Sequence, residues 1–142
     1  MKLSAKTEYA CIAVLELAGR YGSGEPARVR DIADAHAIPS RFLVQILLQL
    51  KAAGLVNSVR GAAGGYQLIR PPEDVTLGAV MAVMEGRSEP PEWQAGDSSP
   101  QTRALRGVWR EAAEAQRELL ESVTLADLLE RTAGSAEPMY YI

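Results

Sequence analysis

The sequence predicts a mainly helical α+β protein in which a winged helix-turn-helix domain precedes a long dimerisation helix. Segment 40–53 has apolar residues at helical spacing, and two short β-like runs, 55–59 and 66–69, follow it directly. A helix beside a small hairpin is typical of winged helix-turn-helix proteins, whose helix enters a major groove of DNA. Farther along, segment 100–123 has the one-sided apolar pattern of a long amphipathic helix.

Segment 40–53 is the predicted recognition helix. Pro39 and Ser40 are typical of a helix start, and Gly54 is typical of a helix end. The residues expected to face the core are Leu43, Ile46, Leu47 and Leu50. Arginine and glutamine read the edges of guanine and adenine, and serine commonly binds phosphate. The candidate DNA contacts of this helix are therefore Ser40, Arg41, Val44 and Gln45. A merely solvated helix face is the alternative, and the hairpin beside it favours DNA.

The loop between the two β-like runs, residues 60–65, reads RGAAGG. Its three glycines suit a tight connection and let the backbone approach a surface closely. Arg60 at its start is predicted to enter a minor groove. The other candidate contacts of the wing are Ser58, Gly61, Gly64 and Tyr66. The candidates for phosphate contact elsewhere are Lys2, Lys6, Arg28, Arg30 and Lys51.

Further helices are expected on both sides of this unit. They cover 3–21, 29–36 and 77–85. Ser4 is the expected N-cap of the first of these helices, and Thr76 is the expected N-cap of the third. A capping-box variant, TLAD at 124–127, begins a last short helix. The chain is thereby divided into a DNA-binding domain, 1–86, a loop, 87–99, a dimerisation region, 100–134, and a tail, 135–142.

The helix over 100–123 begins with Ser99-Pro100, a favourable first turn. At ~1.5 Å per residue it is roughly 36 Å long. A subunit of this size cannot bury one whole side of such a helix alone. We therefore predict a homodimer, with an interface that includes Leu105, Val108, Trp109, Ala112 and Leu119.

Charge is distributed unevenly along the 142 residues. The net charge is −3, yet residues 1–70 hold nine Lys and Arg against five acids, while residues 71–142 hold six against thirteen. A basic front half suits a nucleic-acid-binding domain, and the acidic back half suits either another partner or solvated helices. No stretch approaches the ~20 apolar residues that span a membrane, and no signal-peptide core follows Met1-Lys2. We expect a cytoplasmic protein without a membrane partner.

Residues 58–68, SVRGAAGGYQL, resemble the wing of the Rrf-two family of bacterial transcriptional regulators, kin of the iron–sulfur cluster assembly regulator. The family's usual wing reads roughly SVRGPGGGYxL. The lead-in LKAAGLV at 50–56 and the opening MKLSAK with Tyr9-Ala10 also match. The resemblance runs from residue 1 to about residue 86. It implies a winged helix-turn-helix fold and sequence-specific DNA binding.

The chain departs from the family's pattern at three places. Val44 stands where the family typically has an acid that takes part in base selection in some members; valine can meet a thymine methyl but cannot accept from a cytosine amino group. Ala62-Ala63 replace Pro-Gly, which should change the stiffness of the wing. Many relatives bind an iron–sulfur cluster through three cysteines after the wing domain, and residues 86–104 contain none. We therefore expect no cofactor and no metal, and interpret Glu8, which matches an acidic ligand of some relatives, as a surface or interface acid.

Few other residues suggest chemistry. Cys11 is the only cysteine, which excludes an internal disulfide, and a buried structural role is favoured over a redox switch. His36 is expected to occupy a favourable helix end. Trp93 and Trp109 are expected in core or dimer packing, with a pocket for an unidentified small-molecule effector as the alternative. No second histidine, paired cysteine or phosphate loop is present.

The sequence thus predicts a dimeric repressor that binds a roughly palindromic double-stranded operator. Its mechanism is docking, since no constellation of nucleophile, base and orienting group occurs, and no catalytic residue is assigned. The alternative is a winged-helix module for protein contacts that has lost DNA binding. Arg41, Arg60 and the basic front half count against that alternative.

Overall fold

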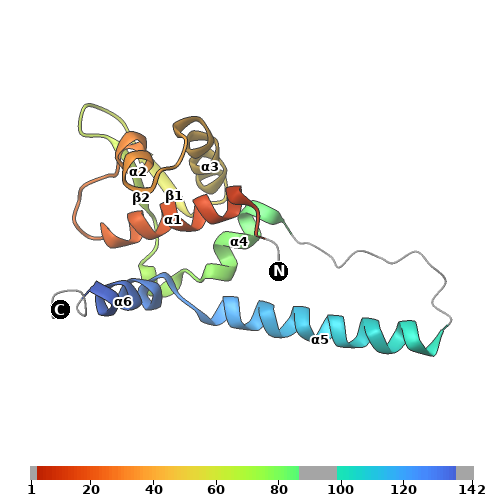
Figure 1. The fold of residues 1–142 in the computed structure, drawn as a ribbon. Helices are drawn as coiled ribbons and strands as arrows, with labels where there is room; N and C mark the ends of the chain where they lie inside the picture. Colours follow the sequence, from red (N-terminus) through yellow and green to blue (C-terminus); the bar gives the residue numbers. More distant parts are fainter. Residues whose placement is uncertain (1–2, 87–98, 137–142) are drawn as a thin grey trace.

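The computed structural model describes residues 3–86 and 99–136 (Figure 1). In chain order its elements are α1 (Ala5–Gly19), α2 (Val29–His36), α3 (Ser40–Ala52), β1 (Val56–Val59), β2 (Gly65–Leu68), the 3₁₀ helix η1 (Pro72–Asp74), α4 (Leu77–Glu85), α5 (Pro100–Ser122) and α6 (Leu125–Ala136). Most of them form one body, from which α5 projects. Among the described helices, none is both long and apolar enough to cross a membrane.

Helix α1 lies at the centre of the body and contacts α2, α3, α4, α6 and β2. Ser4 caps it, because its Oγ accepts a hydrogen bond of 3.1 Å from the N–H of Thr7. Its inner residues are almost completely buried and mostly small: Ala10, Ala13, Val14 and Leu17. The predicted helix over 3–21 is two residues too long at each end, since Ser4 is the cap and the backbone leaves the helix at Arg20.

The helix-turn-helix consists of α2 and α3. Helix α2 has the bounds that the sequence predicts, and it ends at Ala37, which adopts the left-handed conformation with φ 54° and ψ 42°. The N–H of Ile38 then bonds to the carbonyl of Ala33 at 3.0 Å, and α3 starts after Pro39. The four residues predicted to face the core from α3 are all buried: Leu43, Ile46, Leu47 and Leu50.

The wing is an antiparallel pair in the register Val56↔Leu68, Asn57↔Gln67, Ser58↔Tyr66 and Val59↔Gly65. The predicted strand 55–59 begins one residue too early, and the predicted strand 66–69 is shifted by one residue because Gly65 belongs to the ladder. Leu55 and Ile69 lie just outside it, although the N–H of Ile69 still bonds to the carbonyl of Leu55 at 3.0 Å. A third segment joins the pair through an isolated bridge between Ala27 and Tyr66.

The C-terminal helices attach to the body beside α4. Thr76 caps α4 as predicted, and the N–H of Leu77 bonds to the carbonyl of Val123 at 2.8 Å. The expected capping box is confirmed, since Thr124 and Asp127 exchange backbone-to-side-chain bonds of 3.0 Å in both directions. Leu125 is fully buried, so α6 completes the core against α1. Helix α6 continues to Ala136, past the predicted end of this region at 134.

Helix α5 meets the body only near its C-terminal end, where Gly78 of α4 comes close to Glu121. The rest extends away from the other helices (Figure 1). No residue of α5 is buried. Four of its large apolar side chains are exposed in the subunit: Leu105, Val108, Trp109 and Leu119.

Candidate nucleic-acid interface

The outward face of α3 has the four residues that the sequence predicts there. Ser40, Arg41, Val44 and Gln45 are all exposed, on the side opposite the buried leucines of the helix. The guanidinium of Arg41 lies 5.3 Å from the ring centroid of Phe42, a cation–π distance. Sequence reasoning missed Leu48, which is 52% exposed one turn beyond Val44, itself 40% exposed. Their spacing of four residues could have indicated a shared apolar strip.

Arg60 and Gly61 are both exposed at the wing tip. Gly61 has φ +107°, in the region that favours glycine, and its carbonyl accepts a 3.0 Å bond from the N–H of Gly64. Gly64 is buried, and a Cβ there would lie 2.1 Å from the carbonyl oxygen of Val59. Gly64 therefore has a structural role inside the turn. The predicted DNA contacts that are exposed at the tip are Arg60 and Gly61.

Tyr66 and Ser58 lie in the ladder, where they face each other across β1 and β2. Tyr66 is half-buried against the core, and its backbone pairs with Ala27 as well. Ser58 is exposed and its Oγ accepts a 2.7 Å hydrogen bond from Nζ of Lys51. The wing thus includes both predicted residues, with Tyr66 in a packing position and Ser58 at the surface.

The predicted phosphate contacts have different environments. Lys6 and Arg30 are exposed, and Lys2 lies outside the described residues. Lys51 donates to Ser58, and a guanidinium nitrogen of Arg28 donates to the carbonyl oxygen of Ala62 at the wing tip. Two of these cations therefore contact the wing within the protein itself.

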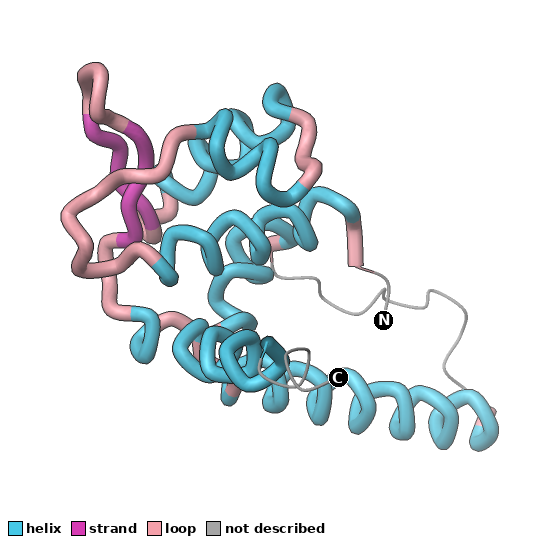
Figure 2. The backbone as a smooth tube through the Cα atoms, turned by 60° about the vertical axis from the view of Figure 1, so that its left-hand side comes forward, coloured by secondary structure: helices cyan, strands magenta, loops and turns pink. Residues whose placement is uncertain are grey.

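Helix α3 and the wing loop lie at the same end of the molecule, away from α5 and α6, in both views (Figures 1 and 2). A helix with exposed arginine and glutamine thus stands beside a hairpin with an exposed arginine at its tip. This is the arrangement that places a helix in a major groove and a wing arginine in an adjacent minor groove.

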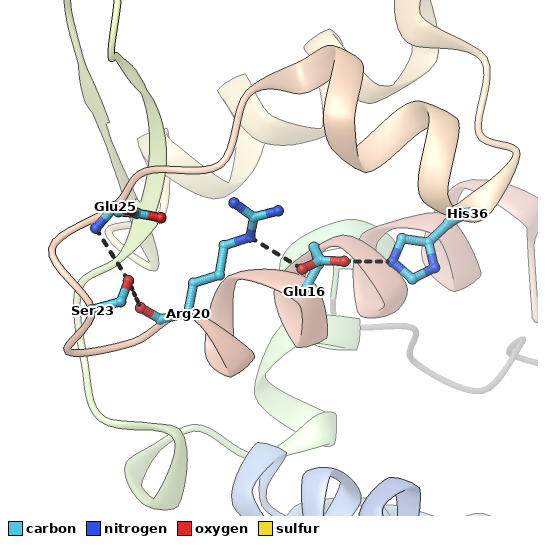
Figure 3. A network of polar contacts seen from close by, with 5 residues as sticks. All are labelled: Glu16, Arg20, Ser23, Glu25 and His36. Atoms are coloured by element: carbon cyan, nitrogen blue, oxygen red, sulfur yellow. Dashed lines mark hydrogen bonds and ion pairs between the residues drawn. The ribbon is translucent and has the colours of Figure 1, made fainter. Parts of the chain in front are cut away.

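A polar network fixes α2, the helix before the recognition helix, to the centre of the body (Figure 3). Glu16 of α1 bonds to Nε2 of His36 at 3.0 Å and accepts from Nε of Arg20 at 3.2 Å. Partial burial acts to raise the pKa of Glu16, but the hydrogen bonds from His36 and Arg20 outweigh it and lower this pKa below its usual range. The sequence suggested only a helix-end position for His36, and its partner lies twenty residues away in the sequence.

We expect Glu16→Gln to lower the free energy of unfolding near pH 6 by about 0.5 kcal/mol, the typical value for a solvent-screened ion pair. The pKa of Glu16 is lower in the folded than in the unfolded state, so its contribution exists above the unfolded pKa and disappears as the pH falls through the folded pKa. Denaturant titrations at several pH values measure it. The control Glu25→Gln removes an exposed carboxylate near the network and should show no such convergence at low pH. A difference that stayed constant down to pH 3 would contradict this role of Glu16.

Cys11 lies half-buried in α1, against the core. Burial, followed by the charges of Glu85 and Glu8, raises the pKa of the thiol from 9.0 to about 11. The reactive thiolate is therefore scarce at neutral pH, which favours the structural role over the redox switch. Glu8 itself is exposed, as expected for a surface acid.

The apolar stripe of α5 is open to solvent. Leu105 is 49% exposed, Val108 60%, Trp109 45% and Leu119 62%. A shallow hollow on this face is lined by Trp109, Ala112, Ala113, Ala115, Gln116 and Leu119. One helix forms all of this lining, so the hollow is an open surface feature and not an enclosed ligand cavity. Trp93, the other side of the alternative effector pocket, lies outside the described residues.

Comparison with known proteins gives consistent matches over nearly the whole chain. A family model described as Rrf2, iron-dependent transcriptional regulator, matches residues 3–131. The HTH-type transcriptional regulator CymR of Bacillus subtilis is 38% identical over 143 residues, which span all of both chains. The HTH-type transcriptional regulator IscR of Vibrio parahaemolyticus is 33% identical, over 91% of this chain and 77% of its own.

Solved structures show the same likeness. CymR, described as the global cysteine regulator of B. subtilis, matches with a TM-score of 0.82 and 36% identity, covering 92% of this chain and 98% of its own. IscR of T. potens matches with a TM-score of 0.80 and 35% identity, covering 99% and 97% respectively. The winged helix-turn-helix fold predicted from the sequence is confirmed.

Proposed function

Because the chain belongs to the Rrf2 family and is a DNA-binding transcriptional regulator, we propose that it is a dimeric repressor that works without an iron–sulfur cluster. The observation that supports the mode of binding most directly is the common orientation of α3 and the wing tip (Figure 2). Arg41, Val44 and Gln45 would meet base edges in the major groove, with Ser40 on phosphate. Arg60 would enter the neighbouring minor groove.

The dimer follows from the exposure of α5. An apolar helix face held away from the body leaves Val108 and Leu119 about three-fifths exposed. Burial of such a face typically contributes ~25 cal/mol per Å² of apolar surface. If the same face of a second copy of the chain packed against it, both side chains would be removed from water. Two recognition helices would then reach half-sites about one helical turn, ~34 Å, apart.

The iron in the family's description does not fit the donor set of this chain. The sequence contains one cysteine, and Cys11 is half-buried with a raised pKa. Within residues 3–86 and 99–134, no three His, Cys, Asp or Glu side chains come together closely enough to hold a metal ion. Iron–sulfur clusters are held mainly by thiolates, so the proposed repressor binds DNA without such a cluster.

We expect protein purified without oxygen to be colourless and to contain no stoichiometric iron or sulfide. Operator binding should survive a chelator, and Cys11→Ser should change the affinity by less than about twofold in reducing and oxidising buffer, because the raised pKa keeps the thiol protonated. Absorption spectra, iron and sulfide analysis and binding titrations measure these results. A brown protein, or an affinity change seen only when Cys11 is oxidised, would contradict the proposal.

Repression requires only that the dimer occupy a promoter. Transcription in vitro from a template with the selected binding sequence over the promoter tests this directly. We expect the transcript to decrease as the protein is added, with a midpoint near the dissociation constant for the operator. A rising transcript would show activation instead.

Val44 and Leu48 should make the recognition helix sensitive to thymine methyl groups. Uracil lacks this methyl, and one buried CH₂ or CH₃ group is worth about 0.8 kcal/mol, or about fourfold in affinity. We expect thymine-to-uracil replacement at the base facing Val44 to weaken binding by about that factor in the wild type and to have no effect in Val44→Ala. The control Gln45→Ala keeps the thymine preference. Equal affinity for thymine and uracil at every position of the operator would contradict methyl contact.

A further inference from the structure

Arg60 stands between two anchor points on the wing. Two residues before it, Ser58 accepts a 2.7 Å hydrogen bond from Nζ of Lys51, in the last turn of α3. Two residues after it, the carbonyl oxygen of Ala62 accepts a hydrogen bond from the guanidinium of Arg28, the residue immediately before α2. Both ends of the helix-turn-helix therefore reach the hairpin on either side of its exposed arginine.

Backbone contacts fix the base of the wing to the same segment. The N–H of Ala27 bonds to the carbonyl of Tyr66 at 2.9 Å, and the N–H of Tyr66 bonds to the carbonyl of Ala27 at 2.8 Å. Gly65 is essential to this approach, because a Cβ there would lie 2.4 Å from the carbonyl oxygen of Ala27. The segment before α2 is thus joined to β2 by an isolated bridge, and the side chain of Arg28, the next residue, reaches the wing tip at Ala62.

We propose that Arg28 and Lys51 are positioning residues that hold Arg60 at a set place relative to the recognition helix, and are not phosphate contacts. The inference rests on the proposed use of Arg60 in the minor groove and adds how Arg60 is placed there. A five-residue loop with two alanines in place of a stiffer Pro-Gly has few constraints of its own. Donors from α3 and from the start of α2 supply such constraints, and they couple the wing to the helix that reads the major groove.

A double-mutant cycle separates the two roles. We expect Arg28→Ala to weaken operator binding about three- to tenfold, as loss of a hydrogen bond commonly does. Combined with Arg60→Ala, it should add less than about twofold, because a residue that acts through Arg60 has nothing left to position. The matched control Arg30→Ala removes an exposed arginine two residues away, and its effect should add to that of Arg60→Ala. Lys51→Ala should behave as Arg28→Ala does.

The salt dependence provides a second readout. In the Arg60→Ala background, loss of a phosphate contact lowers the slope of log affinity against log salt by about 0.9 per contact, whereas loss of a residue that acts only through Arg60 leaves the slope unchanged. In the free protein, ¹⁵N relaxation should show lower order parameters for the amides of residues 61–64 in Arg28→Ala, without a change at α3. This arm needs no DNA and tests the anchoring itself.

The failures of this inference and of the proposed function are distinguishable. If Arg60→Ala binds the operator as the wild type does, the proposed minor-groove role fails and the inference fails with it. If Arg60→Ala binds weakly while Arg28→Ala has no effect, the wing is placed by its backbone contacts and only the inference is overturned. Additive effects with a reduced salt slope would likewise overturn it and make Arg28 a phosphate contact.

Discussion

We expect Arg60→Ala to weaken binding to the operator about 10- to 100-fold, the range for loss of an arginine that reads a groove. The residue is exposed at the wing tip and does not belong to the buried core, so its removal should take away a contact with DNA and leave the core packing intact. The dimer and the melting temperature should stay as in the wild type. Fluorescence anisotropy with a labelled operator measures the affinity, and calorimetry measures the melting temperature.

Arg70→Ala is the matched control for this variant. Arg70 is also exposed but follows the wing at its base, so its loss removes the same charge without removing the probe at the tip. Its effect should stay within about threefold and should be a change in salt dependence alone. An affinity of Arg60→Ala within about twofold of the wild type would show that the wing does not read DNA.

We expect Trp109→Glu to produce monomers that bind the operator at least about 100-fold more weakly than the wild type. Trp109 lies in the middle of the exposed apolar face of α5, beside Val108 and Ala112. A glutamate there would place one charge from each subunit in a water-excluding interface. Each monomer would then bind a half-site without the effective concentration that a tethered partner provides. Sedimentation velocity measures the oligomeric state, and anisotropy measures the binding.

Arg110→Glu introduces the same side chain at the next position of α5, which helical spacing turns away from the stripe and which is exposed. This control should remain dimeric. If sedimentation showed an intact dimer for Trp109→Glu, the interface would lie elsewhere than on the apolar face of α5.

Elements that depend on residues close together in the sequence could be predicted well. Helix α2 begins and ends where the apolar spacing and the turn before Pro39 indicate, and the caps Ser4, Thr76 and Thr124 are confirmed by their hydrogen bonds. These signals are local, since each cap bonds within three residues along the chain. The wing motif likewise identified the exposed tip, because glycines and an arginine between two β-like runs allow few other structures.

The periodicity of the sequence could not predict contacts between segments that are distant along the chain. The sequence does not show that Arg28 reaches Ala62, that Glu16 bonds to His36, or that Leu125 completes the core. A lone arginine before a helix looks the same whether it will contact phosphate or a carbonyl of its own chain. Which of the two occurs depends on where the wing packs, and that is set by the Ala27 bridge and the close approach at Gly65.

Sequence-specific DNA binding by the unmodified protein is the central claim, and one measurement tests it most directly. Selection from a genomic library would yield a bound sequence, whose affinity is then compared with that of a scrambled duplex over a range of salt concentrations. We predict at least about 10³-fold tighter binding to the selected sequence. The affinity should also fall steeply with salt, with a log–log slope of about −4 or steeper. Equal and weak binding to both duplexes at every salt concentration would contradict the account and leave the winged helix as a module for protein contacts.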